Sequence, residues 1–230
     1  MKKRRFSAEL AYILGLVLLG LGTAFIVKTN FGVSMVVAPA YLLHLKISPY
    51  LPFFTFGVAS YTVQFLLVAA LSIALRKKKL SYWFSFGTAV LYGYILDGLT
   101  LAVDLLSCDT IVARILFFSF GLVTAAAGIA FMFKTYIPVE AYDLVVKELA
   151  IHFKKPIPHI KLLFDMSCLV VSIILSFAFF GLGVFRGISY GTIACALLNA
   201  RTIGLFSRIY DHYFKFVPTF KKCQAFLAKY

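Results

Sequence analysis

The chain has 230 residues, of which 62% are hydrophobic and 17% aromatic, and its mean hydropathy is +0.93. Soluble domains carry roughly 45–50% apolar residues, so this composition excludes an ordinary soluble protein and indicates an integral membrane protein. The net charge of +14 does not indicate nucleic-acid binding, because the basic residues form short clusters between apolar stretches, as the positive-inside rule predicts for membrane proteins.

A repeated segment organises the chain. Residues 15–29 read GLVLLGLGTAFIVKT and residues 121–135 read GLVTAAAGIAFMFKT, with eight identities in fifteen aligned positions. Both copies are apolar, carry glycine on one side and end in Lys-Thr. The repetition indicates a duplicated membrane unit, with residues 1–106 as the first unit and 107–210 as the second. Residues 211–230 are expected to form a basic, aromatic tail at the membrane surface.

Six apolar stretches are long enough to cross about 30 Å of hydrocarbon as helices. They are residues 6–27, 52–75, 84–103, 114–133, 160–181 and 188–206. Small residues in the first stretch, among them Gly15 and Gly22, predict a surface that packs closely on another helix. Residues 33–45 and 138–153 are too short to span and predict re-entrant or interfacial helices. The predicted fold is therefore an all-α membrane protein with six transmembrane helices and two short ones.

The positive charges favour this count over eight spans. With six spans, 18 lysines and arginines lie on one side of the membrane and 4 on the other, and eight spans give about 14 to 7. The six-span topology places both termini in the cytoplasm. Three spans per unit make the second unit enter the membrane from the opposite side, so the units form an inverted repeat. Such repeats recur in secondary transporters, where a site lies near the midplane between them.

Polar residues inside apolar stretches are candidates for a solute-binding site. Asp97 and Arg201 lie 104 residues apart at corresponding positions of the two units, and their opposite charges predict an ion pair across the symmetry axis. Gln64 and Asn199 lie within spans, where amides more often join helices than bind ligands. Asp165 begins a span and either lies at the interface or faces the interior of the bundle.

Two lysines and the second short segment complete the candidates. Lys28 and Lys134 occupy the same place in the repeat, and they either anchor their helices at opposite membrane surfaces or hold an anionic group. In the second short segment, Glu140 and Asp143 lie on a different face from an apolar stripe. This helix either lies on the cytoplasmic surface or re-enters the membrane, with both carboxylates lining a polar cavity.

The sequence predicts neither a metal site nor an enzyme. The four cysteines lack C-x-x-C spacing and the four histidines are dispersed. The chain contains no H-E-x-x-H, P-loop, G-x-S-x-G or dinucleotide-binding motif. We therefore expect a protein that binds no metal and catalyses no reaction.

Four segments resemble the YczE/YyaS/YitT-type bacterial integral membrane proteins: KTNFGVSMVVAP, IPVEAYDLVVKEL, IKLLFDMSCLVVSIILSF and GISYGTIACALLNARTIGLFS. The resemblance extends over about residues 6–210. It implies a bacterial cytoplasmic-membrane protein without a cofactor. The residues of interest that it implies are Asp143, Asp165, Gly191 and Thr192. The chain departs from the commoner Gly-Pro ending of the last span, because it has Asn199-Ala200-Arg201 there.

The expected function is that of a transporter or permease that moves a small solute through a site at the interface of the two units. The expected partners are the lipid bilayer, the solute, and either a second copy joined through the glycine faces or a partner subunit. The alternative is a non-transporting accessory or regulatory subunit, or a substrate-capture subunit that acts with a partner protein. The candidate binding residues are Asp97, Arg201, Gln64, Asn199, Asp143, Glu140, Asp165, Lys28 and Lys134.

Overall fold

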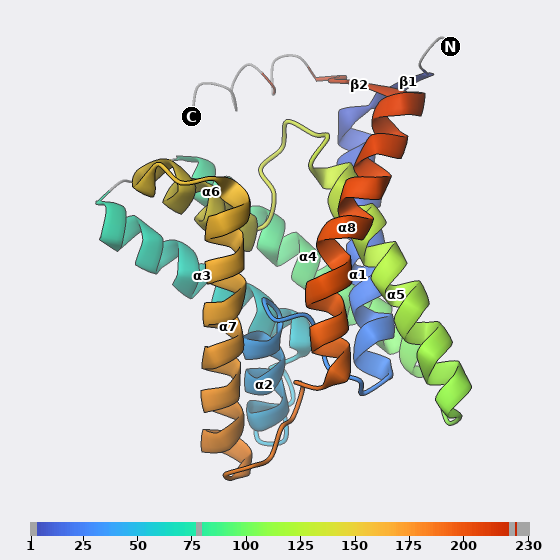
Figure 1. The fold of residues 1–230 in the computed structure, drawn as a ribbon, viewed down its shortest axis with the longest axis vertical. Coiled ribbons are helices and arrows are strands. Elements are labelled where there is room, and N and C mark those ends of the chain that lie inside the picture. Colours follow the sequence, from blue (N-terminus) through green and yellow to red (C-terminus); the bar gives the residue numbers. More distant parts are fainter. Residues whose placement is uncertain (1–3, 77–79, 221–223, 225–230) are drawn as a thin grey trace.

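The computed structural model describes residues 4–76, 80–220 and 224. Among these residues it contains eight helices: α1 (Ala8–Lys28), α2 (Ala38–Ile47), α3 (Phe56–Leu75), α4 (Leu80–Asp104), α5 (Ile111–Met132), α6 (Ala141–Phe153), α7 (Ile157–Phe180) and α8 (Tyr190–Tyr213). Two short strands, β1 (Arg4–Ser7) and β2 (Phe214–Val217), pair in parallel at one end of the molecule (Figure 1). The all-α prediction is confirmed apart from this strand pair.

Five helices are long and apolar enough to cross a membrane, and they match five of the six predicted spans. These helices are α1, α3, α4, α5 and α7. The sixth predicted span corresponds to α8, which has 24 residues but is not among the five, because Asn199 and Arg201 lower its hydropathy. The two short helices are confirmed. With 10 and 13 residues, α2 and α6 measure about 15 and 20 Å, less than the hydrocarbon core.

Several helices begin at a hydroxyl side chain that caps the first turn. The hydroxyl oxygens of Ser7, Thr55 and Thr110 accept hydrogen bonds from backbone N–H groups at the starts of α1, α3 and α5. Ser189 and Thr192 form a reciprocal capping box at the start of α8. Such caps satisfy donors that the helix itself leaves unpaired. The chain beyond α8 continues as β2, so residues 211–217 of the expected surface tail belong to α8 and to the strand pair, and residues 221–223 and 225–230 lie outside the described residues.

The central contact of the bundle joins α1 and α5, which run antiparallel (Figure 1). A Cβ atom added to Gly15 would lie 2.9 Å from the carbonyl oxygen of Gly128, and one added to Gly22 would lie 2.5 Å from that of Gly121. The two backbones therefore touch, which only glycine permits at these four positions. The predicted packing surface is confirmed. Because it is buried inside the molecule, it cannot also join two copies, and the expected dimer through the glycine faces is wrong.

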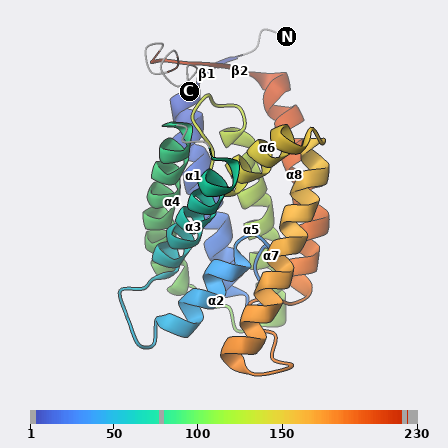
Figure 2. The same ribbon diagram turned by 90° about the vertical axis from the view of Figure 1, so that its left-hand side faces the viewer.

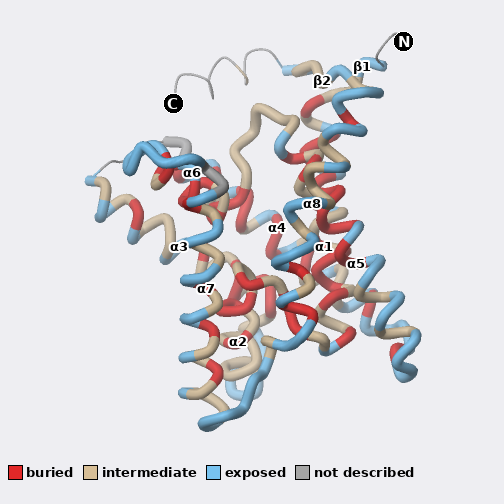
Figure 3. The backbone as a smooth tube through the Cα atoms, in the orientation of Figure 1, coloured by how far each residue is buried: buried red, intermediate tan, exposed pale blue. Residues whose placement is uncertain are grey.

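The other helices surround this centre in two similar sets. α4 packs on α1 and α8 packs on α5, while α2 and α6 each pack on both α3 and α7. α2 and α6 lie toward opposite ends of the molecule (Figure 2). The sets differ at two contacts. α3 packs along α4 whereas α7 makes no comparable contact with α8, and α4 packs on α6 whereas α8 makes no comparable contact with α2. Buried residues gather around α1 and α5, and few residues of α7 are buried (Figure 3).

Candidate functional site

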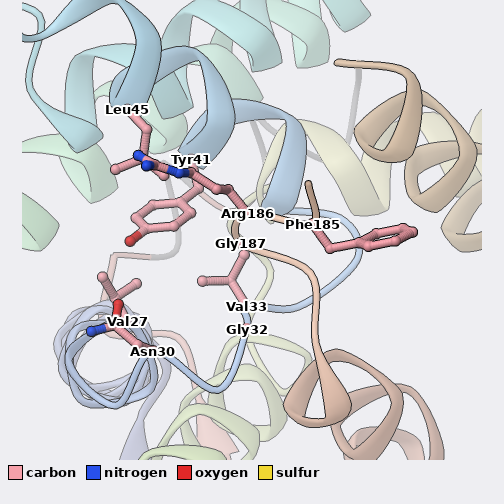
Figure 4. Close-up of a pocket in the computed structure, with 9 residues that line it drawn as sticks. All are labelled: Val27, Asn30, Gly32, Val33, Tyr41, Leu45, Phe185, Arg186 and Gly187. Carbon is pink, nitrogen blue, oxygen red and sulfur yellow. The ribbon is translucent and has the colours of Figure 1, made fainter. Parts of the chain in front are cut away.

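A cavity of about 300 Å³ is lined by residues at the end of α1 that lies away from the β1–β2 pair (Figure 1). Three parts of the chain form its walls: the end of α1 with the segment that follows, α2, and the connection between α7 and α8 (Figure 4). The lining residues are Val27, Asn30, Gly32, Val33, Tyr41, Leu45, Phe185, Arg186 and Gly187. Residues of both sequence units therefore form this cavity.

Backbone hydrogen bonds hold the two walls together. The N–H of Val33 donates to the carbonyl of Gly187 at 3.0 Å, and the N–H of Gly191 donates to the carbonyl of Phe31 at 2.8 Å. Gly32 adopts a φ of +97°, and a Cβ atom there would lie 2.7 Å from the backbone nitrogen of Ser189. Glycine is therefore required where the first unit meets the second.

Arg186 extends into the cavity toward Tyr41 and Leu45 (Figure 4). Its guanidinium carbon lies 4.8 Å from the centre of the Phe180 ring, which is the geometry of a cation–π contact. Burial raises the pKa of the Tyr41 hydroxyl, the positive charge of Arg186 lowers it, and the negative charge of Asp104 raises it. The Tyr41 hydroxyl thus lies in the field of both a cation and a carboxylate on the wall of the cavity.

A larger cavity of about 610 Å³ shares Val27, Asn30, Tyr41 and Leu45 with the first. It continues along the ends of α4 and α5. Its remaining lining residues are Lys28, His44, Thr100, Asp104, Leu105, Leu106, Ser107, Cys108, Asp109 and Arg114. The two cavities together form a polar vestibule, by which we mean the space lined by these two sets of residues.

Lys28 at the end of α1 pairs with an aspartate on α4, and Lys134 just after α5 pairs with an aspartate on α8. The Nζ of Lys28 lies 3.4 Å from Oδ1 of Asp104 at the end of α4, and the Nζ of Lys134 lies 2.7 Å from Oδ2 of Asp211 near the end of α8. Lys28 lines the vestibule. The two lysines lie at opposite ends of the α1–α5 pair, so the structure does not bring them together.

The predicted ion pair between Asp97 and Arg201 is wrong. The Asp97 carboxylate accepts hydrogen bonds from the N–H of Gly57 at 2.7 Å and from the hydroxyl of Thr55 at 2.5 Å, at the start of α3. Arg201 lies exposed on α8. The physical reason is the packing: α4 lies along α3, and the donors at the start of that helix are the nearest partners for its carboxylate.

The remaining candidates include a group at the start of α6. Glu140 precedes the first residue of this helix and is 8% exposed. The side-chain oxygen of fully buried Gln64 accepts a hydrogen bond from the N–H of Ala141 at 3.0 Å. Seven of the thirteen residues of α6 are buried, so this helix packs within the protein on both α3 and α7.

Several buried polar atoms at this place have no hydrogen-bond partner among the described residues. They are Oε1 of Glu140, Nε2 of Gln64, the hydroxyl of Ser60 and the hydroxyl of Tyr142. Burial raises the pKa of Tyr142 well above its ordinary value, and the charge of nearby Glu140 raises it further. The hydroxyls of Ser60 and Tyr142 face each other without reaching the geometry of a hydrogen bond. We call these four residues the buried polar group.

Asp143 and Asp165 lie beside the buried polar group and share one cation. The Nζ of Lys161 lies 3.5 Å from Oδ1 of each carboxylate. Asp165 therefore faces the neighbouring helix α6 and is not an isolated residue at the interface. Asn199 is half-buried on α8, and its Oδ1 has no partner among the described residues. The structure thus brings together Gln64, Glu140, Asp143 and Asp165, and it places Asp97, Asn199, Arg201 and both repeat lysines elsewhere.

Among the described residues, no group of three or more His, Cys, Asp or Glu side chains could hold a metal ion. The sequence alone did not indicate several residues of the vestibule and of the buried polar group. Tyr142 and Arg186 were not among the candidate residues, because a tyrosine in an apolar segment and an arginine between two spans give no local sign of a site. Ser60 and Tyr41 carried no signal, because nothing local in the sequence indicates which helix a hydroxyl faces.

The fold and these sites define a multi-pass helical membrane protein with polar residues where its two sequence units meet. The chain belongs to DUF6198, a family of unknown function whose model matches residues 6–208. No curated protein and no solved structure matches the chain. The resemblance to the YczE/YyaS/YitT-type proteins covers almost the same residues, and no named homologue confirms it.

Proposed function

We propose that this protein is a transporter that moves a small polar solute between two inverted repeat units in the bacterial cytoplasmic membrane. The observation that carries the proposal is the vestibule, because its smaller cavity is walled by both units and is open at one end of the molecule. An accessory subunit has no need for such a space. Two inverted units with a site between them are typical of secondary transporters.

Three sets of contacts support an inverted repeat. Gly15 corresponds to Gly121 in the repeat and Gly22 corresponds to Gly128, so each glycine contacts the counterpart of the other, as a two-fold axis requires. The ion pairs of Lys28 and Lys134 join equivalent helix ends. These ion pairs join α1 to α4 and the end of α5 to α8, and the two helix pairs are equivalent in the repeat.

The connections after α1 and α5 provide the third set. The carbonyl of Phe31 accepts a hydrogen bond from Gly191 at the start of α8, and the carbonyl of Pro138 accepts one from Thr88 in α4. In this proposal α8 is the sixth span, and both termini lie in the cytoplasm because most basic residues lie on their side.

The charges of the vestibule favour a solute with an anionic group. Its lining has the basic side chains of Lys28, Arg114 and Arg186 and the carboxylates of Asp104 and Asp109. Lys28 pairs with Asp104. Arg186 extends into the smaller cavity beside the Tyr41 hydroxyl, and a planar guanidinium suits a carboxylate or phosphate group.

Uptake into proteoliposomes tests this proposal. Labelled solutes should be compared as carboxylates, phosphates, amines and sugars, with and without an ion gradient. We expect uptake of an anion, and we expect R186Q to lower it by about tenfold, which corresponds to the loss of ~1.4 kcal/mol of binding. The matched control is R208Q, because Arg208 is also exposed but lies on α8 outside the vestibule.

Two outcomes contradict the proposal. Equal losses in R186Q and R208Q would exclude a specific role of the vestibule. The absence of uptake for every solute class, with folded protein in the liposomes, would favour the accessory or substrate-capture subunit.

A further inference from the structure

The start of α6 holds a carboxyl group in an enclosed place. Glu140 is 8% exposed, and its Oε1 has no hydrogen-bond partner among the described residues. The Glu140 side chain does not itself cap the first turn of α6. An isolated ionised carboxylate is costly to bury, and the protonated form is favoured unless a cation or several donors compensate for the charge.

The backbone on both sides of Glu140 is held by helices of the first unit. Ser85 donates to the carbonyl of Val139 at 2.6 Å, and Gln64 accepts from the N–H of Ala141 at 3.0 Å. The donors and acceptors belong to α4 and α3, whereas α6 belongs to the second unit. Glu140 is therefore fixed at a junction between the units and cannot turn freely toward solvent.

Among the described residues, no cation pairs with Glu140 alone. Lys161 on α7 is close to both Asp143 and Asp165, so its single charge is shared between two other carboxylates. The groups that face the Glu140 region are Asp143 and Tyr142 on α6, Lys161, Asp165 and Cys168 on α7, Tyr92 on α4, Tyr12 on α1, and the uncharged Gln64 and Ser60 on α3. With all acids ionised, the cluster carries more negative than positive charge.

We propose that Glu140 is a proton-binding site that couples solute movement to proton movement, an inference that rests on the proposed transport function. A proton neutralises the carboxylate and needs no cavity, so it can occupy this enclosed place. The carboxyl group takes a proton from water on one side of the membrane and releases it to water on the other when the units change their arrangement. The movement of the proton requires no other reactant.

The electrostatics agree with this geometry. Burial raises the pKa of the Glu140 carboxyl to about 8, the charge of Asp143 raises it as well, and that of Lys161 lowers it. The group therefore changes its protonation near neutral pH, where a coupling residue must work.

Infrared spectroscopy of the full chain in lipid nanodiscs, titrated with pH, tests proton binding without any solute. We expect the wild type to show a protonated-carboxyl band that disappears near pH 8, and E140Q to lack this band. E148Q is the matched control, because Glu148 is equally buried on the same helix and accepts a hydrogen bond from Tyr82. The proposal is overturned if the wild type lacks the band, if E140Q keeps it, or if E148Q loses it.

Uptake of labelled succinate into proteoliposomes tests the coupling. An inward proton gradient should stimulate uptake by the wild type and by E148Q several-fold, and it should not stimulate E140Q. If E140Q responds like the wild type, the coupling role is wrong while the transport function stands. If the wild type takes up neither succinate nor any other solute of the panel, both the transport function and the coupling are wrong, whatever the infrared titration finds.

Discussion

The two sequence units share their central contacts and differ where the third and fourth helices of each unit meet. α3 packs along α4, but α7 stands away from α8 (Figure 1). In the first unit, the backbones of Gly57 and Gly93 touch and Asp97 binds the start of α3. In the second unit, Arg201 occupies the place of Asp97 and is exposed. A carboxylate is thus present where the helix pair packs together, and a guanidinium is present where the corresponding pair is apart.

The short helices differ in a similar way. Val37 precedes α2, and Glu140 precedes α6. Val37 lies near the vestibule, and Glu140 is a member of the buried polar group. Of the two short helices, only α6 is preceded by a carboxyl group.

The shared contact between α1 and α5 gives the largest expected effect. G22V places a branched side chain against the carbonyl of Gly121, which is backbone and cannot move aside. We expect the yield of monodisperse protein in size-exclusion chromatography to fall by an order of magnitude, and G128V to behave alike. G98V is the control, because a Cβ atom at Gly98 meets nothing within 4 Å. Normal yields for G22V would contradict the backbone contact.

The difference between the short helices predicts a pH dependence of stability. Between the ordinary carboxyl pKa of 4.5 and about 8, native Glu140 holds a proton that the unfolded chain has released. The free energy of unfolding should therefore decrease as the pH rises through this range, and thermal unfolding in detergent measures it. E140Q removes this dependence and E148Q retains it. A wild type whose unfolding temperature rises over the range would contradict the burial of this carboxyl group.

α3 packs along α4, but α7 does not pack comparably on α8. Substitutions at Asp97 and at Arg201 should therefore lower the free energy of unfolding by different amounts. D97A removes two hydrogen bonds from a charged acceptor, and we expect a loss of roughly 1.5–3 kcal/mol in unfolding free energy. R201A removes an exposed side chain, and we expect a change within about 0.5 kcal/mol. Chemical unfolding in mixed micelles measures the free energies of unfolding of D97A and R201A. Equal costs would mean that Asp97 does not fasten α3 to α4.

The two lysine–aspartate pairs give the smallest expected effect on stability. Their aspartates are more than half exposed, so K28M and K134M should each cost less than about 1 kcal/mol, and by similar amounts. Uptake should separate the two variants, because Lys28 lines the vestibule. We expect K28M to lower anion uptake several-fold and K134M to leave it unchanged. Equal uptake by both variants would leave Lys28 as a helix anchor alone.

Much of the fold was predictable because it depends on local properties. The lengths of apolar stretches predicted the five long candidate spans and the short helices α2 and α6. α8 was the weakest match, because its polar residues lower its hydropathy. The strand pair β1–β2 was not predicted, since parallel pairing between the two ends of the chain depends on where α1 and α8 bring those ends.

The candidate site was predictable only in part. Gln64, Glu140, Asp143 and Asp165 were chosen as polar residues in or beside apolar segments, and they do lie near one another. The pairing of Asp97 was predicted from repeat symmetry and failed, because equivalent positions need not be neighbours. A carboxylate binds the nearest unpaired donor, and the start of α3 supplied it.

The sequence by itself determined the five long apolar helices, the two short helices, and the glycine surface on which α1 and α5 pack. Those features are recorded in residues close together along the chain, as length, hydropathy and the spacing of small residues. Only the tertiary structure decided that Tyr41 and Arg186 share a cavity, that Asp97 binds Thr55, and that Glu140 is enclosed without a cation. The partner of a polar group depends on which helices pack side by side, and that choice depends on contacts between residues far apart in the sequence.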